Sequence, residues 1–236
     1  MERDVIIACD FSDKSTCLDF IDLFGEKSKK GEKKPFVKIG MELYYSVGPD
    51  IVKELKNRGH KVFLDLKLHD IPNTVQKAMS VLAGLGVDMC NVHAGGGSAM
   101  MEAAMKGLGG KTKLIAVTQL TSTSQQRLED ELLIQKPMDE VVKHYAECAS
   151  KAGLDGVVCS PLEAGAVKER CGASFLTVTP GVRFAEEDAG DQVRITTPEA
   201  ARKLGSDYIV VGRPITQAQD PVAAYMRCVK EFLGGC

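Results

Sequence analysis

Short apolar runs and longer amphipathic stretches alternate along almost the whole chain. The apolar runs are rich in β-branched residues and predict strands at residues 5–9, 36–39, 62–66, 89–92, 114–117, 156–159, 175–178 and 208–211. The stretches between them repeat apolar residues three or four positions apart, which predicts helices at residues 15–24, 50–58, 75–85, 98–107 and 138–152. Strand, helix and strand in about eight repeats predict parallel βαβ units.

Two folds share this alternation, a (β/α)8 TIM barrel and an open, doubly wound sheet. Polar residues of the types that catalyse reactions or bind ligands follow the strand ends throughout the chain, at Asp10, Lys67, Asp70, His93, Thr121 and Arg213. An open sheet gathers its ligand groups at one switch point, whereas a barrel collects them from every βα loop. No G-x-G-x-x-G follows the first strand. The sequence therefore predicts an α/β fold of the (β/α)8 TIM-barrel class, as a single domain over residues 1–236.

Composition and charge are those of a soluble globular protein, with 44% apolar and 26% charged residues. The 30 Lys and Arg residues are balanced by 32 Asp and Glu, so no basic surface for nucleic acid is expected. No signal peptide and no membrane-spanning run is apparent. The eight cysteines include no C-x-x-C pair. This usage predicts a reduced, cytoplasmic protein without a structural zinc site.

The densest group of polar residues follows the third predicted strand and runs from Asp65 to Thr74, as DLKLHDIPNT. Alternation along a strand places Phe63, Asp65 and Lys67 on one face and the intervening leucines on the other. The leucine face suits packing against helices, so the charged face points into the barrel. A charged pair there is unfavourable unless it is paired or used. Two interpretations stand: a buried ion pair that locks the strand, and a pair that does chemistry.

The motif resembles that of the bacterial orotidine 5′-phosphate decarboxylases, whose D-x-K-x-x-D-I-P-x-T is unbroken from Asp65 to Thr74. The resemblance covers nearly the whole chain. Further matches are FVKIG around Lys38, Asn91-Val-His93, Val117 to Thr121, Pro180 to Arg183, and Val211-Gly212-Arg213. It implies an enzyme that converts orotidine 5′-monophosphate to uridine 5′-monophosphate (UMP) and CO₂, the last step of de novo UMP synthesis. It also implies that no metal or organic cofactor takes part.

The same resemblance assigns roles to individual residues. The implied catalytic residues are Lys67, Asp65, Asp70 and Lys38. The implied substrate contacts are Asp10, Lys38, Ile71, Thr74, Thr121, Arg183, Gln192, Gly212 and Arg213. Because family members are homodimers, Asp70 and Thr74 are expected to enter the site of the partner chain.

The residue types of the motif suit decarboxylation on chemical grounds. Loss of CO₂ from an unsaturated ring carbon leaves a poorly delocalised carbanion, which needs a proton donor beside it. Lys67 lies between Asp65 and Asp70 in the sequence, and flanking carboxylates favour the ammonium form of a lysine. A substrate carboxylate about 4 Å from Asp65 would be repelled by roughly 4 kcal/mol at an effective dielectric constant near 20. Binding energy from a remote 5′-phosphate must supply the rest.

A phosphate site is expected where the last two strands end, because many barrel enzymes bind phosphate with those loops. Thr179-Pro-Gly-Val-Arg183 follows the seventh strand, and Gly212-Arg213 follows the eighth. Glycine allows close approach of a backbone, and arginine offers paired hydrogen bonds to phosphate. Residues 185–191 are a candidate lid over the substrate.

Two other functions stay open from the residues alone. Metal-dependent decarboxylases or aldolases of sugar phosphates share D-x-K-x-x-D but usually lack the following Ile-Pro-x-Thr, and their activity would need Mg²⁺. A barrel that senses pyrimidine nucleotides without catalysis is the second, against which the intact Asp65, Lys67 and Asp70 argue. His93 fits a structural role, and no H-x-x-x-H or acidic cluster beside a histidine predicts a metal site.

Overall fold

Eight parallel strands close into one barrel, with each strand hydrogen-bonded to the next in chain order and β8 to β1. The structure is a computed structural model that describes residues 3–27, 34–186 and 196–234. The strands are β1 (Asp4–Ala8), β2 (Phe36–Gly40), β3 (Val62–Leu68), β4 (Met89–His93), β5 (Lys113–Val117), β6 (Gly156–Val158), β7 (Leu176–Thr179) and β8 (Tyr208–Val211). The closed strand order confirms the (β/α)8 barrel and excludes the open sheet.

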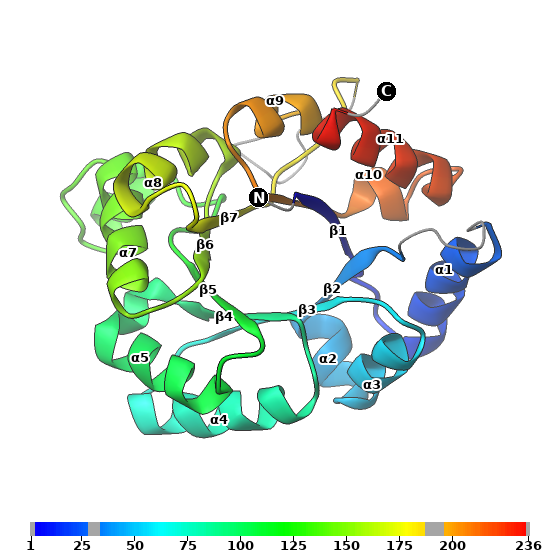
Figure 1. Ribbon diagram of the computed structural model, residues 1–236. Helices are drawn as coiled ribbons and strands as arrows, with labels where there is room; N and C mark the ends of the chain where they lie inside the picture. Colours follow the sequence, from blue (N-terminus) through cyan, green and yellow to red (C-terminus); the bar gives the residue numbers. More distant parts are fainter. Residues whose placement is uncertain (1–2, 28–33, 187–195, 235–236) are drawn as a thin grey trace.

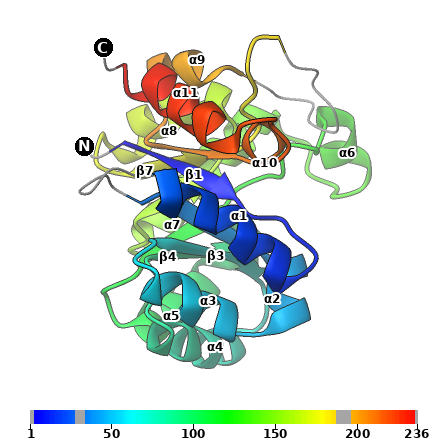
Figure 2. The ribbon, with the colours of Figure 1, turned by 90° about the vertical axis from the view of Figure 1, so that its right-hand side faces the viewer.

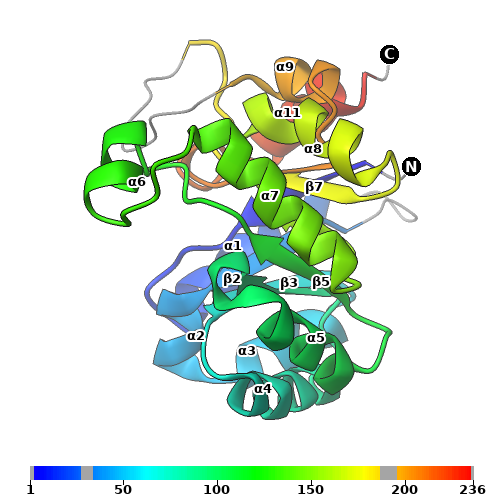
Figure 3. The ribbon, with the colours of Figure 1, turned by 90° about the vertical axis from the view of Figure 1, so that its left-hand side faces the viewer.

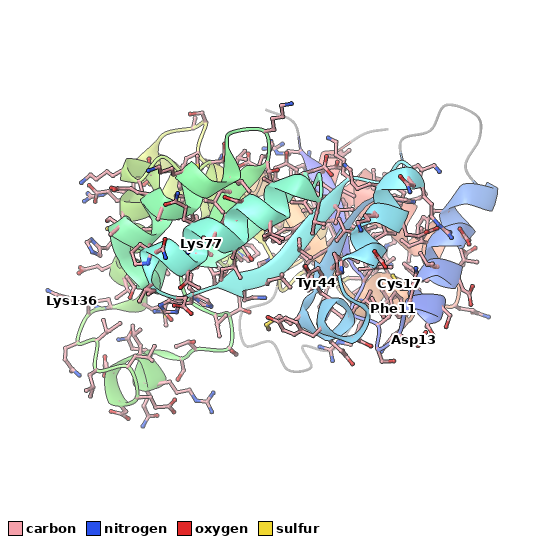
Figure 4. The ribbon with its side chains drawn as sticks, turned by 90° about the horizontal axis from the view of Figure 1, so that it is seen from below. Phe11, Asp13, Cys17, Tyr44, Lys77 and Lys136 are labelled. Carbon is pink, nitrogen blue, oxygen red and sulfur yellow. The ribbon has the colours of Figure 1, made fainter. Side chains whose placement is uncertain are left out.

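Helices surround the ring of strands (Figure 1). They are α1 (Lys14–Lys27), α2 (Met41–Val47), α3 (Asp50–Asn57), α4 (Pro72–Gly84), α5 (Gly97–Leu108), α6 (Gln125–Asp130), α7 (Met138–Lys151), α8 (Ala164–Cys171), α9 (Pro198–Lys203), α10 (Arg213–Thr216) and α11 (Pro221–Leu233). Figure 4 shows Asp13 just before α1, where its carboxylate accepts a hydrogen bond from the backbone of Thr16 and so caps the helix. Among the described helices, none has the length and apolar character needed to cross a bilayer.

Alternate residues of each strand divide the core into two parts. One set, which includes Ile7 and Leu64, packs outward against the helices, and the other fills the barrel interior. The inner face changes character along a strand. In β2 the buried Phe36 is followed two residues later by Lys38, and in β3 Phe63 is followed by Asp65. The barrel is therefore apolar within and charged near its carboxyl end.

The connection between β5 and α7 leaves the barrel wall and carries the short helix α6, on the side where the strands end (Figure 2 and Figure 3). The side chain of Ser124 caps α6 by accepting a hydrogen bond from the backbone of Arg127. Leu132 and Leu133, which follow the helix, are exposed by 51% and 77%. This helix was not predicted, because six residues are too few to display an apolar period.

Candidate active site

A chain of alternating charges lies at the carboxyl ends of β1, β2 and β3. The Lys67 Nζ atom donates to Oδ1 of Asp65 at 2.8 Å, and Oδ2 of the same carboxylate lies 3.4 Å from Nζ of Lys38. Lys38 in turn donates to Oδ1 of Asp10 at 2.7 Å. The order Asp10, Lys38, Asp65, Lys67 gives each inner charge an opposite neighbour on both sides.

The two inner members of this chain, Lys38 and Asp65, are each only 8% exposed. Burial alone would raise the pKa of Asp65, but the charges of Lys38 and Lys67 outweigh it, so the pKa lies below its usual value. Burial likewise would lower the pKa of Lys38, but Asp65 and Asp10 outweigh it and the pKa is raised. Both side chains are therefore charged at neutral pH.

Strand β3 is irregular where it delivers Lys67. Leu64 pairs with Cys90 of β4 and Leu68 with Val92, so β3 advances four residues while β4 advances two. Lys67 takes φ of 52°, in the left-handed region that residues other than glycine seldom adopt. Bulges of this kind commonly redirect a side chain beside an active site. Lys67 does face the interior as expected, but the simple two-residue alternation is not what places it there.

Two adjoining cavities open at this end of the barrel. The first, of about 280 Å³, is lined by Lys38, Asp65 and Lys67 together with apolar strand ends, Gln119 and Thr121. The second, of about 390 Å³, is lined among others by Asp10, Lys38, Arg183, Gly212 and Arg213. Lys38, Pro180 and Val210 line both. The site thus combines a chamber with a lysine ammonium and a chamber with two arginines.

The Asp70 segment lies elsewhere in this chain. Asp70, Ile71 and Thr74 are exposed, Ile71 by 66%, and none of them lines either cavity. The Asp70 carboxylate accepts a hydrogen bond from the backbone N–H of Ile71 at 2.6 Å. Within one chain Lys67 is therefore paired with Asp65 and not with Asp70, because β3 ends before Asp70 and the chain turns outward into α4. The expected entry of Asp70 into the site of a partner chain stays a prediction. Gln192 and most of the expected lid lie outside the described residues.

Two residues without a predicted role complete the site. Asn91 of β4, 1% exposed, accepts a hydrogen bond from the backbone N–H of Lys67 at 2.8 Å and donates to Oδ1 of Asp65 at 2.7 Å. A Cβ atom on Gly40 would lie 2.8 Å from Oδ1 of Asp10, so glycine leaves room for the Asp10–Lys38 ion pair. In the sequence, both lie in segments that match the family, FVKIG and Asn91-Val-His93, but neither segment assigns them a role.

His93 ends β4 beside the network, with its ring centroid 5.8 Å from that of His69. Burial lowers the pKa of His93, and the neighbouring His69 and Lys67 lower it further. Among residues 3–27, 34–186 and 196–234, no three His, Cys, Asp or Glu side chains are grouped as ligands for one metal ion.

Comparison with known proteins gives full-length matches. The family described as Orotidine 5′-phosphate decarboxylase / HUMPS family matches residues 3–228. Proteins named orotidine 5′-phosphate decarboxylase from Geobacillus thermodenitrificans and Bacillus caldolyticus are 54% and 55% identical, over 100% of this chain and 99% and 97% of theirs. The crystal structure of orotidine 5′-phosphate decarboxylase from Lactobacillus acidophilus matches with a TM-score of 0.85 and 44% identity, over 98% of this chain and 99% of that one.

Proposed function

This chain belongs to the orotidine 5′-phosphate decarboxylase / HUMPS family, and we propose that it decarboxylates orotidine 5′-monophosphate with Lys67 as the proton donor. It is a carbon–carbon lyase of the orotidine 5′-phosphate decarboxylase type, with orotidine 5′-monophosphate as substrate and UMP as product. The observation that carries the proposed role is the position of the Lys67 ammonium, which faces a cavity while held 2.8 Å from the buried carboxylate of Asp65.

The proposed reaction needs no cofactor, because the electron pair stays on the substrate and Lys67 supplies the proton. The bond between C6 of the pyrimidine and its carboxylate breaks, CO₂ leaves, and the electron pair remains on C6. A proton from Nζ of Lys67 then forms the C6–H bond of UMP, and the neutral amine recovers a proton from solvent. Lys67 is suited to this by position, since its side chain is 27% exposed and lines the cavity.

Asp65 is proposed to destabilise the bound substrate relative to the transition state. Its lowered pKa keeps it charged, and its 8% exposure limits screening by water. Two like charges at about 4 Å repel by roughly 4 kcal/mol at an effective dielectric constant near 20, or about three powers of ten in rate. This repulsion is relieved as CO₂ departs.

The second cavity is proposed to bind the 5′-phosphate. Arg183, Gly212 and Arg213 line it, and guanidinium groups pair strongly with phosphate oxygens. Lys38 and Asp10 line this cavity as well, which suits contacts to the ribose between phosphate and base. Thr121 lines the first cavity, where the pyrimidine would lie. Gln192, proposed to bridge phosphate and base, lies outside the described residues.

We further propose a homodimer in which Asp70, Ile71 and Thr74 complete the site of the partner chain. Their exposure at the start of α4 supports this, because a segment that serves a partner must point away from its own barrel. An equal mixture of Asp70→Ala and Lys67→Ala chains should recover about a quarter of wild-type activity, since half of the dimers would carry one intact site. No recovery after demonstrated subunit exchange would contradict the shared site.

The cellular setting is also a proposal. Seven cysteines of the described chain, Cys9, Cys17, Cys90, Cys148, Cys159, Cys171 and Cys228, carry free thiols. Free thiols suit a reducing compartment, which supports the expected cytoplasmic location.

The function is tested by following the absorbance of orotidine 5′-monophosphate with purified protein in the presence of EDTA. Turnover should persist in the chelator. A folded protein that does not consume this substrate would refute the assignment. Turnover that stops in EDTA and returns with Mg²⁺ would refute the cofactor-free step.

A further inference from the structure

We propose that Asn91 is a positioning residue whose buried side-chain amide holds Lys67 and Asp65 in the geometry that decarboxylation requires. The inference deepens the function proposed for Lys67 and rests on it. It is carried by the pairing of β3 with β4, by the backbone of Lys67, and by two hydrogen bonds of one amide.

The first step concerns the strand pairing. Between two paired positions, β4 supplies the single residue Asn91, whereas β3 supplies residues 65–67. In a regular parallel ladder, alternate residues of β3 would bond to the backbone of β4. The slip in register interrupts that pairing between Leu64 and Leu68, and the backbone N–H of Lys67 has a side-chain partner instead.

The Asn91 side chain bonds one backbone group and one carboxylate of this stretch. Its Oδ1 accepts from the backbone N–H of Lys67 at 2.8 Å, and its Nδ2 donates to Oδ1 of Asp65 at 2.7 Å. The orientation of the amide is fixed by chemistry, because a backbone N–H only donates and an ionised carboxylate only accepts. At 1% exposure, the amide has no competition from bulk water.

Both contacts bear on the reacting lysine. Lys67 has φ of 52°, a conformation that is unfavourable for a residue with a Cβ and persists only where the surroundings enforce it. The Asn91 oxygen binds the backbone N–H of this same residue. The Asn91 nitrogen binds the carboxylate oxygen that also receives the Lys67 ammonium. One side chain thus holds both the backbone of Lys67 and the carboxylate that binds its ammonium group.

Two substitutions separate these contacts. Asn91→Asp keeps an acceptor for the Lys67 backbone but places a like charge against Asp65, whereas Asn91→Leu removes both hydrogen bonds at similar size. We expect both to lower kcat by about 100-fold, the effect of misplacing a catalytic group by about 1 Å. KM for orotidine 5′-monophosphate should stay within about threefold, because the arginine-lined cavity on β7 and β8 is untouched.

A matched control is Thr112→Val. The Thr112 hydroxyl donates to the backbone oxygen of Val87 at 2.8 Å, at the opposite end of β4 and β5, and the residue is 7% exposed. Its loss removes a buried hydrogen bond near the same strands without touching the network. We expect a lowered Tm with kcat within about twofold of wild type, so stability and positioning are told apart.

Crystal structures of the two Asn91 variants give a readout that does not depend on activity. In Asn91→Leu, φ of Lys67 should leave the left-handed region or its Nζ should leave Asp65. In Asn91→Asp, the left-handed φ should persist while Asp65 moves. An unchanged Lys67 and Asp65 in both variants, or a kcat that falls no more than in Thr112→Val, would overturn the proposal. Should the wild type fail to decarboxylate the nucleotide, the proposed function fails, while φ of residue 67 in Asn91→Leu still decides whether Asn91 holds that backbone.

Discussion

Two partly buried lysine–aspartate pairs lie at opposite ends of the barrel and have different surroundings. At the carboxyl end, Lys67 donates to Asp65 and lines a cavity. At the amino end, Lys168 of α8 donates to Asp207, which directly precedes β8. The amine of Lys168 also donates to the backbone oxygens of Ala173 and Phe175 at 2.9 and 2.8 Å.

The number of satisfied donors separates a structural pair from a chemical one. The three hydrogens of the Lys168 ammonium have three acceptors, and Asp207 also accepts from the backbone and hydroxyl of Thr177. The Lys67 ammonium makes one hydrogen bond within the described chain, and its side chain is 27% exposed against 15% for Lys168. A lysine whose remaining N–H groups face a cavity can donate hydrogen bonds or a proton to a ligand bound there. This agrees with the general division of barrels into a catalytic carboxyl face and a stabilising amino face.

The largest effect is expected from Asp65→Asn, which removes the charge proposed to repel the substrate carboxylate. We expect kcat to fall by about 10³-fold, in line with roughly 4 kcal/mol of lost repulsion. Steady-state decarboxylation measures this. The unfolding free energy should change less than for Asp207→Ala, because Lys38 keeps its bond to Asp10. A kcat within tenfold of wild type would contradict the role of the Asp65 charge.

Asp207→Ala should lower stability and leave kcat unchanged, the reverse of Asp65→Asn. The substitution leaves the Lys168 ammonium, which has little access to solvent, without its carboxylate. Breaking a buried pair in this way lowers the unfolding free energy by about 3–5 kcal/mol. Equilibrium unfolding in urea measures the loss, and kcat per folded molecule should not change. A large fall in kcat in the folded variant would mean that the amino-end pair is not merely structural.

Arg213→Ala tests the cavity with two arginines at the carboxyl end of the barrel. Loss of charge-assisted hydrogen bonds worth about 1.5–3 kcal/mol should lower kcat/KM for orotidine 5′-monophosphate by roughly 10- to 100-fold. Orotidine, which lacks the phosphate, serves as the control substrate, and its slow turnover should be insensitive to the substitution. An equal loss on both substrates would argue against phosphate binding by Arg213.

The smallest effect concerns pH and involves one histidine at each end. Burial lowers the pKa of His60, which contacts the backbone oxygen of Pro35, and of His93 below the usual 6.5. The unfolded chain therefore binds protons at a higher pH than the folded chain, so stability is full above about pH 6.5 and falls as pH drops below it. Urea unfolding at pH 7.5 and 5.5 should show this fall, and His60→Gln and His93→Gln should each reduce it. A wild-type stability that rises on acidification would contradict the assignment.

Much of the fold was predictable because the apolar period and the strand ends are local signals. The closed strand order and the shared position of Lys38, Asp65 and Lys67 follow from those signals. The link through Asn91 was not predictable, because it depends on a slip in register between β3 and β4 that exists only after they pair. The Lys168–Asp207 pair joins residues 39 positions apart with no motif.

Two further features had no signal in the residue pattern itself. The outward position of Asp70 was implied only by the family resemblance, because sequence spacing does not say where a strand ends and the chain turns away. The requirement for glycine at position 40 could not be predicted, because a larger residue would collide with Asp10 and Lys38. Asp10 follows β1 and Lys38 lies in β2, so the contact forms only in the folded chain. The contact at Gly40 joins different strands, so no pattern within one strand shows it.

The most direct test compares Lys67→Met with Lys168→Met in the same two assays, decarboxylation of orotidine 5′-monophosphate and equilibrium unfolding in urea. Lys67→Met should lose about 10³-fold in kcat, as expected for removal of a general acid, with little loss of stability. Lys168→Met should keep its kcat per folded molecule and lose about 3 kcal/mol or more of unfolding free energy. A folded Lys67→Met protein that retains kcat within tenfold of wild type would contradict the account.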